Sequence, residues 1–132
     1  MSSLTEVAKK IEEDNQPFEV YANEEFRNVN TEIEGRFIVI CPVTKRPDEL
    51  WLTIKLVPNG KGEFIEYVSF YSWLLSLADE QLGIEGSCDL IFKSIEEICK
   101  PTLLEVKVET GYKVINQKAF RTNSHKYLDK KQ

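Results

Sequence analysis

Histidine and cysteine, the residues that build most zinc sites and disulfide frameworks, are scarce in this chain. Its 132 residues include one histidine and three cysteines, an odd number, and the cysteines show no Cys-x-x-Cys spacing. Zinc sites and disulfide frameworks normally need paired or closely spaced ligands. The sequence therefore predicts neither a metal site nor a disulfide framework, and His125 is expected to lie in a terminal tail without a chemical role.

Long apolar runs and glycine-rich motifs are also missing. No stretch reaches the roughly 18 consecutive apolar residues of a membrane-spanning helix, and the N-terminus lacks the apolar core of a signal peptide. The sequence therefore predicts a cytoplasmic protein with no membrane contact. A G-x-G-x-x-G fingerprint for dinucleotide binding is absent too, so we expect no cofactor to be held in that way.

The composition predicts a single domain whose positive charge gathers at the C-terminal end. Apolar residues make up 42% of the chain, enough for one core, and a chain of this size often leaves surface for a partner subunit. The net charge is −5, but from Lys107 onward seven Lys or Arg residues stand against two acidic ones. The simpler interpretation is a solvated, disordered tail over residues 118–132, and contact with nucleic acid is the alternative.

The spacing of apolar residues predicts an α+β fold. Ser3-Leu4-Thr5-Glu6 is a capping-box pattern that opens a short amphipathic helix, which we place in an N-terminal extension over residues 1–17. Residues 18–117 are expected to form one domain, an antiparallel sheet with two helices packed on one face. The expected strands are 18–21, 31–40, 50–57 and 103–108, the last extending past Gly111 into 112–115, and the expected helices are 64–78 and 87–99.

One stretch combines residues suited to nucleophilic chemistry. Cys41-Pro42-Val43-Thr44-Lys45-Arg46-Pro47-Asp48 joins two expected strands through a turn bracketed by prolines, which could fold Asp48 back towards Cys41. A thiolate adds to an electron-poor carbon, and a neighbouring acid protonates the negative charge that develops. We expect these roles for Cys41 and Asp48, the alternatives being a buried cysteine and an ordinary turn aspartate. Cys88 and Cys99 share one face of an expected helix and are predicted to pack.

These motifs resemble those of the 7-cyano-7-deazaguanine reductases and their archaeosine-forming relatives, small enzymes of the tunnelling fold. The resemblance covers about residues 34–108. Cys41-Pro42-Val43-Thr44 and Pro47-Asp48 match the family's cysteine-to-aspartate motif. Glu66 and Ser69 fall where the reductases begin a cofactor motif at the start of their first helix. Gly83-Ile84-Glu85 falls where the family has a His-Glu pair that recognises the deazaguanine base.

The resemblance implies a fold, a mechanism and a set of site residues. The sheet of this α+β fold would close into a barrel only across subunits, so a homo-oligomer is expected. Cys41 would add to a nitrile to form a covalent thioimide, Asp48 would handle protons, and Glu85, Glu66 and Ser69 would bind substrate. One ionised carboxylate can accept bonds from the adjacent N1–H and exocyclic amine of a guanine-like ring, which suits Glu85. The alternative for Glu85 is a solvated loop acid.

Two departures from the family pattern direct the functional expectation. Val68 and Tyr71 replace the two lysines that the reductases use around the nicotinamide phosphates, and Ile84 replaces the histidine of the His-Glu pair. The family branch without those lysines is the archaeosine-forming amidinotransferase. We therefore expect cofactor-free conversion of 7-cyano-7-deazaguanine, in tRNA, to a formamidine with ammonia or another nitrogen donor. The alternatives are the NADPH-dependent reductase of queuosine synthesis and a catalytically silent relative that binds a purine-like base.

Overall fold

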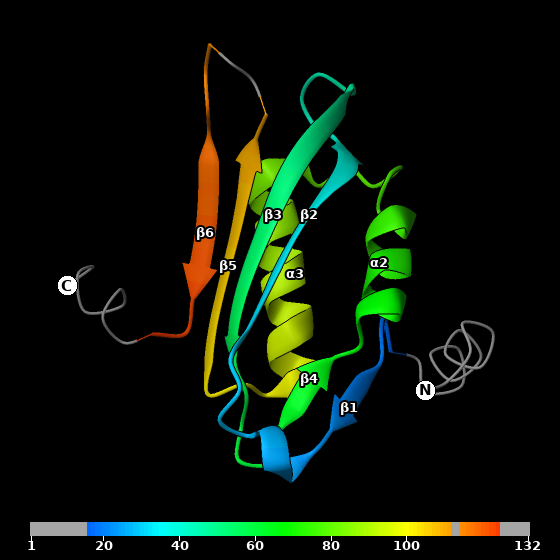
Figure 1. The fold of residues 1–132 in the computed structure, drawn as a ribbon. Coiled ribbons are helices and arrows are strands. Elements are labelled where there is room, and N and C mark those ends of the chain that lie inside the picture. Colours follow the sequence, from blue (N-terminus) through cyan, green and yellow to red (C-terminus); the bar gives the residue numbers. More distant parts are fainter. Residues whose placement is uncertain (1–15, 112–113, 125–132) are drawn as a thin grey trace.

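The computed structural model describes residues 16–111 and 114–124, which form two antiparallel sheets and two α-helices (Figure 1). The larger sheet has the strand order β2 (Thr31–Ile40), β3 (Pro47–Val57), β5 (Leu103–Thr110) and β6 (Lys118–Thr122). The smaller sheet pairs β1 (Val20–Ala22) with β4 (Glu63–Ile65). The helices are α2 (Tyr67–Ser76) and α3 (Gly83–Cys99), and the 3-10 turn η1 covers Glu24–Phe26. The expected N-terminal helix and His125 lie outside the described residues.

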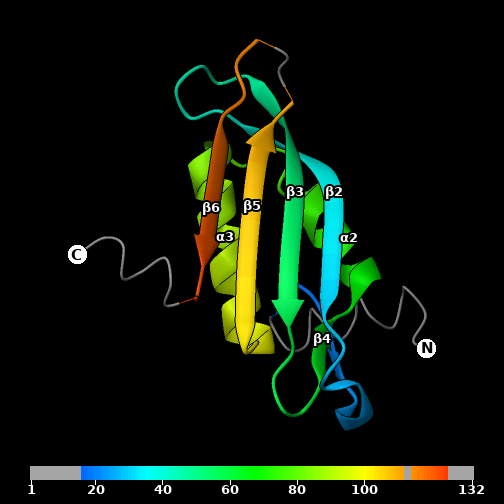
Figure 2. The ribbon, with the colours of Figure 1, turned by 60° about the vertical axis from the view of Figure 1, so that its left-hand side comes forward.

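Both helices cover the same face of the four-stranded sheet. Helix α3 lies against β5 and β6, whereas α2 lies beside β2 (Figures 1 and 2). This arrangement confirms the expected α+β class, with an antiparallel sheet and two helices on one of its faces. No helix within residues 16–111 and 114–124 has the length and apolar character needed to cross a membrane.

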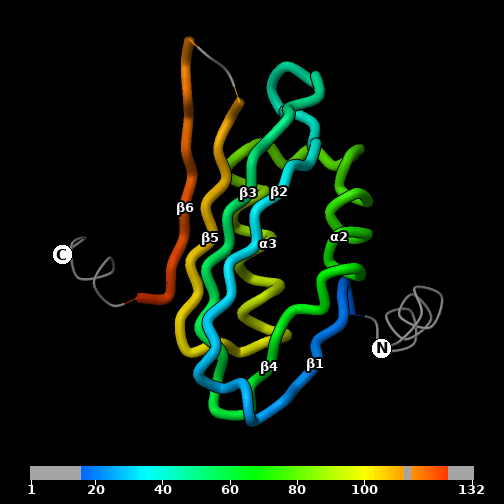
Figure 3. Tube along the Cα trace, in the orientation of Figure 1, coloured from blue at the N-terminus to red at the C-terminus, as the bar shows by residue number. Residues whose placement is uncertain are grey.

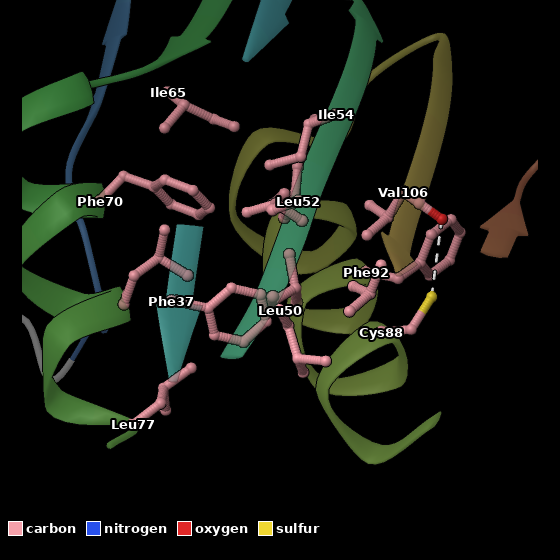
Figure 4. Packing of buried hydrophobic residues seen from close by; sticks show 14 of the residues in the cluster. Phe37, Leu50, Leu52, Ile54, Ile65, Phe70, Leu77, Cys88, Phe92 and Val106 are labelled. Atoms are coloured by element: carbon pink, nitrogen blue, oxygen red, sulfur yellow. Dashed lines mark hydrogen bonds between the residues drawn. The ribbon is translucent and has the colours of Figure 1, made fainter. Parts of the chain in front are cut away.

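Strand alternation places one side of the sheet in the core. Along β3 every second residue from Leu50 to Leu56 is buried, and the same alternation buries Leu104, Val106 and Val108 on β5. Helix α3 presents a matching apolar stripe at helical spacing. Figure 4 shows how Phe37, Leu50, Leu52, Ile54, Ile65, Phe70, Leu77, Cys88, Phe92 and Val106 lie between the helices and the strands.

An aromatic cluster attaches α2 to this core. Phe18 is fully buried and packs edge-on against Phe70, with ring centroids 5.0 Å apart. Trp73, one turn further along α2, lies 5.3 Å from Phe18 and 5.7 Å from Phe70. The chain before β1 therefore fixes the position of α2.

The helix boundaries differ from the prediction. Residues 64 and 65, expected to begin a helix, pair with β1, because their backbone finds a strand partner and their helical spacing is overridden. Helix α2 starts only after Glu66 caps it and ends at Ser76. Helix α3 starts at Gly83, four residues earlier than expected, because a φ of 64° at this glycine turns the chain into the helix.

The C-terminal part of the sheet also differs from the prediction. Strand β5 ends at Thr110, and residues 114–115 are not part of a strand. Lys118–Thr122, which we expected to belong to a disordered tail, forms β6 and pairs with β5. Arg121 anchors this strand, because its guanidinium lies 4.4 Å from the centre of the Phe92 ring and forms an ion pair with Asp89.

Leu104→Ala should destabilise the fold strongly, because Leu104 is fully buried on the helix-facing side of the sheet. Removing a buried leucine side chain in this way costs about 2–5 kcal/mol of unfolding free energy. Leu75→Ala is the matched control, since Leu75 on α2 is 57% exposed and its loss should change stability by less than about 1 kcal/mol. Denaturant unfolding of both variants checks the core assignment, and equal stabilities would refute it.

Candidate functional site

The cysteine of the sequence motif lies in the turn that joins β2 to β3. The last paired residues of these strands are Ile40 and Pro47. Beyond them the Cys41 N–H donates to the Arg46 carbonyl and the Lys45 N–H donates to the Cys41 carbonyl, each over 2.9 Å. Lys45 adopts a φ of 60°, a left-handed conformation that this tight closure requires. The turn therefore holds Cys41 in a fixed backbone position.

The same turn stabilises the thiolate form of Cys41. The hydroxyl and backbone N–H of Thr44 and the backbone N–H of Val43 lower the pKa of the Cys41 thiol, against smaller opposing effects of desolvation and of Asp48. The Thr44 N–H lies 3.5 Å from Cys41 Sγ. The Arg46 N–H donates to the Thr44 hydroxyl oxygen over 3.4 Å, which leaves the hydroxyl proton available to the sulfur. Cys41 is half-buried, so the sulfur also remains accessible.

The other two cysteines have the opposite properties. Cys88 and Cys99 are buried on α3, which confirms the expectation that they pack in the core. Burial raises the pKa of Cys88 to about 11 and that of Cys99 to about 12. Cys41 is therefore the thiol best suited to act as a nucleophile.

Strand register brings Asp48 to the same side of the sheet as Cys41. Asp48 pairs with Val39, and paired residues of an antiparallel ladder share a face. Because Val39 is buried, that face is the one covered by the helices. Asp48 is half-buried. Its negative charge opposes the thiolate and so offsets a small part of the lowering of the Cys41 pKa. The hairpin thus holds Asp48 close enough for its charge to act on Cys41.

The loop between α2 and α3 docks onto the Cys41 turn. The Ile40 N–H donates to the Glu80 carbonyl over 2.8 Å, and the Lys45 ammonium donates to Gln81 Oε1 over 2.7 Å. Gly83 follows, so close to the turn that a Cβ at this position would lie 3.1 Å from Pro42 Cδ. The first turn of α3 therefore lies directly against the residue that follows Cys41.

Glu85 lies in this first turn of α3, at the same end of the molecule as Cys41. Figure 3 shows the β2–β3 turn, the end of β5 and the start of α3 at this end of the molecule. The Glu85 side chain is exposed, and its Oε1 accepts a 2.7 Å hydrogen bond from Gln117 Nε2. Its Oε2 lies 3.9 Å from the Cβ position at Gly83. Cys41, Asp48 and Glu85 thus lie at the same end of the molecule.

Glu66 and Ser69 lie elsewhere within the chain. The Glu66 carboxylate caps α2 by accepting from the Val68 N–H over 3.1 Å and the Ser69 N–H over 2.6 Å. The Ser69 hydroxyl is buried, accepts from the Glu19 N–H over 2.9 Å and donates to the Glu66 carbonyl over 3.1 Å. These contacts are at the opposite end of α2 from the loop that meets the Cys41 turn (Figure 1). Within one chain, both residues hold the start of a helix.

The positions that depart from the family pattern offer little polar chemistry. The Ile84 side chain is a hydrocarbon and cannot donate a hydrogen bond to a base. It is 6% exposed and packs in the core. Val68 and Tyr71 lie on the first two turns of α2 and carry no charge. Within the described part of the chain, no three His, Cys, Asp or Glu side chains gather closely enough to hold a metal ion.

Two residues of this site escape the sequence analysis. Thr44 lies inside the recognised motif, but only the folded turn reveals that it contacts the sulfur. Gln117 is 32 residues from Glu85 and outside the part of the chain that carries the family resemblance, so no local pattern could have pointed to it. A surface hollow beside Asn59 and Lys100, by contrast, lies at the other end of the molecule and is not part of this cluster.

Comparison with solved structures supports the fold. The chain is similar to the crystal structure of an archaeosine synthase, QueF-Like, in its apo form, with a TM-score of 0.64 and 15% sequence identity. The match covers 70% of this chain and 91% of that one. No protein-family model and no curated protein matches the sequence. At this identity the similarity establishes the shared fold.

Thr44→Val should raise the pKa of Cys41, because it removes the hydroxyl that stabilises the thiolate while nearly keeping the side-chain shape. We expect the alkylation rate of Cys41 by iodoacetamide, followed against pH by peptide mapping, to shift to higher pH. Thr44→Ser should retain the wild-type profile, and the buried Cys88 and Cys99 should stay unlabelled as internal controls. An unchanged Cys41 profile in Thr44→Val would show that Thr44 does not tune the thiol.

Proposed function

We propose that this protein is a cysteine-dependent amidinotransferase that converts the nitrile of 7-cyano-7-deazaguanine in tRNA to a formamidine. The observation that carries the proposal is the thiol of lowered pKa at Cys41, in the turn between β2 and β3, with the Asp48 carboxyl group nearby at the start of β3. The similarity in fold to an archaeosine synthase supports the same assignment. Glu85, at the same end of the molecule, supplies a carboxylate for the base.

The proposed reaction needs only the chain's own residues and ammonia. The Cys41 thiolate attacks the nitrile carbon, a C–S bond forms, and one π bond of the nitrile becomes a lone pair on nitrogen. Asp48 donates a proton to that nitrogen, which gives a thioimide. Ammonia then adds to the same carbon and gives one proton back to Asp48, and the C–S bond breaks with return of the electron pair to sulfur. The product is the nitrile plus one ammonia, a formamidine, so no electron donor is consumed.

Glu85 is proposed to recognise the base. An ionised carboxylate has two oxygens and can accept both the N1–H and the exocyclic amine of a deazaguanine in a charge-assisted pair. Glu85 Oε2 lies 3.9 Å from the Cβ position at Gly83, which itself lies 3.1 Å from Pro42 Cδ, and this closeness to the Cys41 turn suits a base whose nitrile points to Cys41. Ile84 offers the base no polar contact, so this carboxylate bears more of the recognition than the family's His-Glu pair would require.

The complete site is proposed to form between subunits of a homo-oligomer. In the described chain, β2 and β6 are the outer strands of the four-stranded sheet, and each has one edge without a partner strand. Pairing of sheets across subunits would close these edges into a barrel. It would also allow Glu66 of a neighbouring subunit to reach the substrate, whereas the buried hydroxyl of Ser69 would contribute by holding the start of α2 in place.

Contact with tRNA is proposed to involve the basic C-terminal part of the chain. Acidic side chains neutralise part of the positive charge in the portion of this segment that the structure describes. Lys107 and Lys118 lie 3.9 and 3.8 Å from Glu109, and Arg121 pairs with Asp89. The remaining positive charges are at residues 113, 126, 130 and 131, outside the described residues. Phosphate contacts from that segment would make tRNA binding weaken with rising salt concentration.

The function is tested by supplying the nitrile base, in tRNA and as the free base, together with ammonia. We expect a product whose mass exceeds that of the nitrile by one ammonia, formed at the same rate with and without NADPH, and no product from Cys41→Ala. NADPH oxidation with an aminomethyl product would instead identify the reductase. Base binding without either product would identify a catalytically silent relative.

Asp48→Asn should lower turnover in this assay by a factor on the order of 100 or more while base affinity stays near the wild-type value, because it keeps the shape and loses the proton. Glu49→Gln is the matched control: Glu49 is the next residue along β3, exposed, and in an ion pair with Arg36 over 3.7 Å. Equal turnover in the two variants would remove Asp48 from the proton-transfer step.

A further inference from the structure

Gln117 is held rigidly at the point where the chain returns into the sheet. It directly precedes β6, and its carbonyl accepts from the Thr110 N–H over 3.0 Å. Its own N–H donates to the Thr110 hydroxyl oxygen over 3.0 Å. The backbone of Gln117 is therefore fixed to the end of β5, and its side chain extends from a defined position.

The Gln117 side chain engages only part of the Glu85 carboxylate. Nε2 donates to Oε1 over 2.7 Å, which occupies one of the roughly four lone-pair sites of the carboxylate. The other oxygen, Oε2, lies 3.9 Å from the Cβ position at Gly83, the residue at which the start of α3 meets Pro42 of the Cys41 turn. The bond from Gln117 thus holds Glu85 in one rotamer, with Oε2 outside this bond and close to the start of α3.

An exposed glutamate without such a partner would not keep this orientation. Long side chains at the surface populate several rotamers, and selecting one of them costs conformational entropy. Glu85 is exposed, and its neighbour Ile84 packs in the core and offers the base no hydrogen bond. A side chain from another element must therefore orient the carboxylate before a base can bind to it tightly.

We propose that Gln117 is a positioning residue for base recognition, which orients the Glu85 carboxylate towards the Cys41 turn from the β5–β6 connection. This inference rests on the proposed function, because it takes a 7-cyano-7-deazaguanine base as the ligand of Glu85. Gln117 acts through Glu85, so its contribution to affinity exists only while that carboxylate is present. It also explains how base recognition operates with Ile84 at the position of the family histidine.

Calorimetric titration of the full-length protein with 7-cyano-7-deazaguanine tests the proposal. Gln117→Ala should weaken binding about tenfold, in line with the loss of one net hydrogen bond. Gln117→Glu keeps the shape of the side chain but places a second negative charge at the 2.7 Å contact. It should therefore weaken base binding further at neutral pH, and part of the lost affinity should return as the pH falls. In a Glu85→Ala background, Gln117→Ala should have no additional effect.

Asn116→Ala is the control for disturbance of the β5–β6 connection. Asn116 precedes Gln117 and forms hydrogen bonds with Thr110 and Glu109, each over 3.4 Å, and both of these partners lie on β5. It should bind the base like the wild type, and all variants should keep the wild-type pH profile of Cys41 alkylation. Wild-type affinity in Gln117→Ala, or an effect that persists without Glu85, would overturn the role of Gln117 alone. Failure of the wild type to bind the base would overturn the proposed function and this inference with it.

Discussion

The candidate site depends on one close contact, between the β2–β3 turn and the start of α3. At Gly83 the backbone has a φ of 64° and passes so near the turn that a Cβ would lie 3.1 Å from Pro42 Cδ. A larger residue would be strained by the backbone conformation and crowded by the proline. Because Pro42 directly follows Cys41 and Glu85 lies two residues after Gly83, this contact sets the separation between the thiol and the carboxylate.

Position in the fold, rather than residue type, separates the three cysteines. Cys41 lies in a turn whose N–H groups and hydroxyl face its sulfur, and they lower the pKa of the thiol. Cys88 and Cys99 lie on the buried face of α3, where burial raises their pKa values to about 11 and about 12. Burial in the core thus disfavours the thiolate form of two cysteines, and the thiol of lowered pKa is the one at the end of the β2–β3 hairpin.

Local patterns predicted the strands of the central hairpin and the buried face of α3, because apolar periodicity directly reports which side faces the core. They failed at residues 64–65 and at β6, where pairing with a distant strand overrides local spacing. In the site, Cys41 and Asp48 were predictable because a single hairpin joins them. Thr44 and Gln117 were not, since a side-chain contact to sulfur and one across 32 residues depend on tertiary packing.

The proposed function requires a covalent bond between Cys41 and the nitrile carbon. This bond can be detected by mass spectrometry of the intact protein after incubation with 7-cyano-7-deazaguanine in the absence of ammonia, followed by peptide mapping. We expect one added base per chain, located on Cys41, and no addition in Cys41→Ala. An adduct on Cys88 or Cys99, an adduct that survives Cys41→Ala, or a wild-type protein that binds the base without any mass increase would rule out this covalent step.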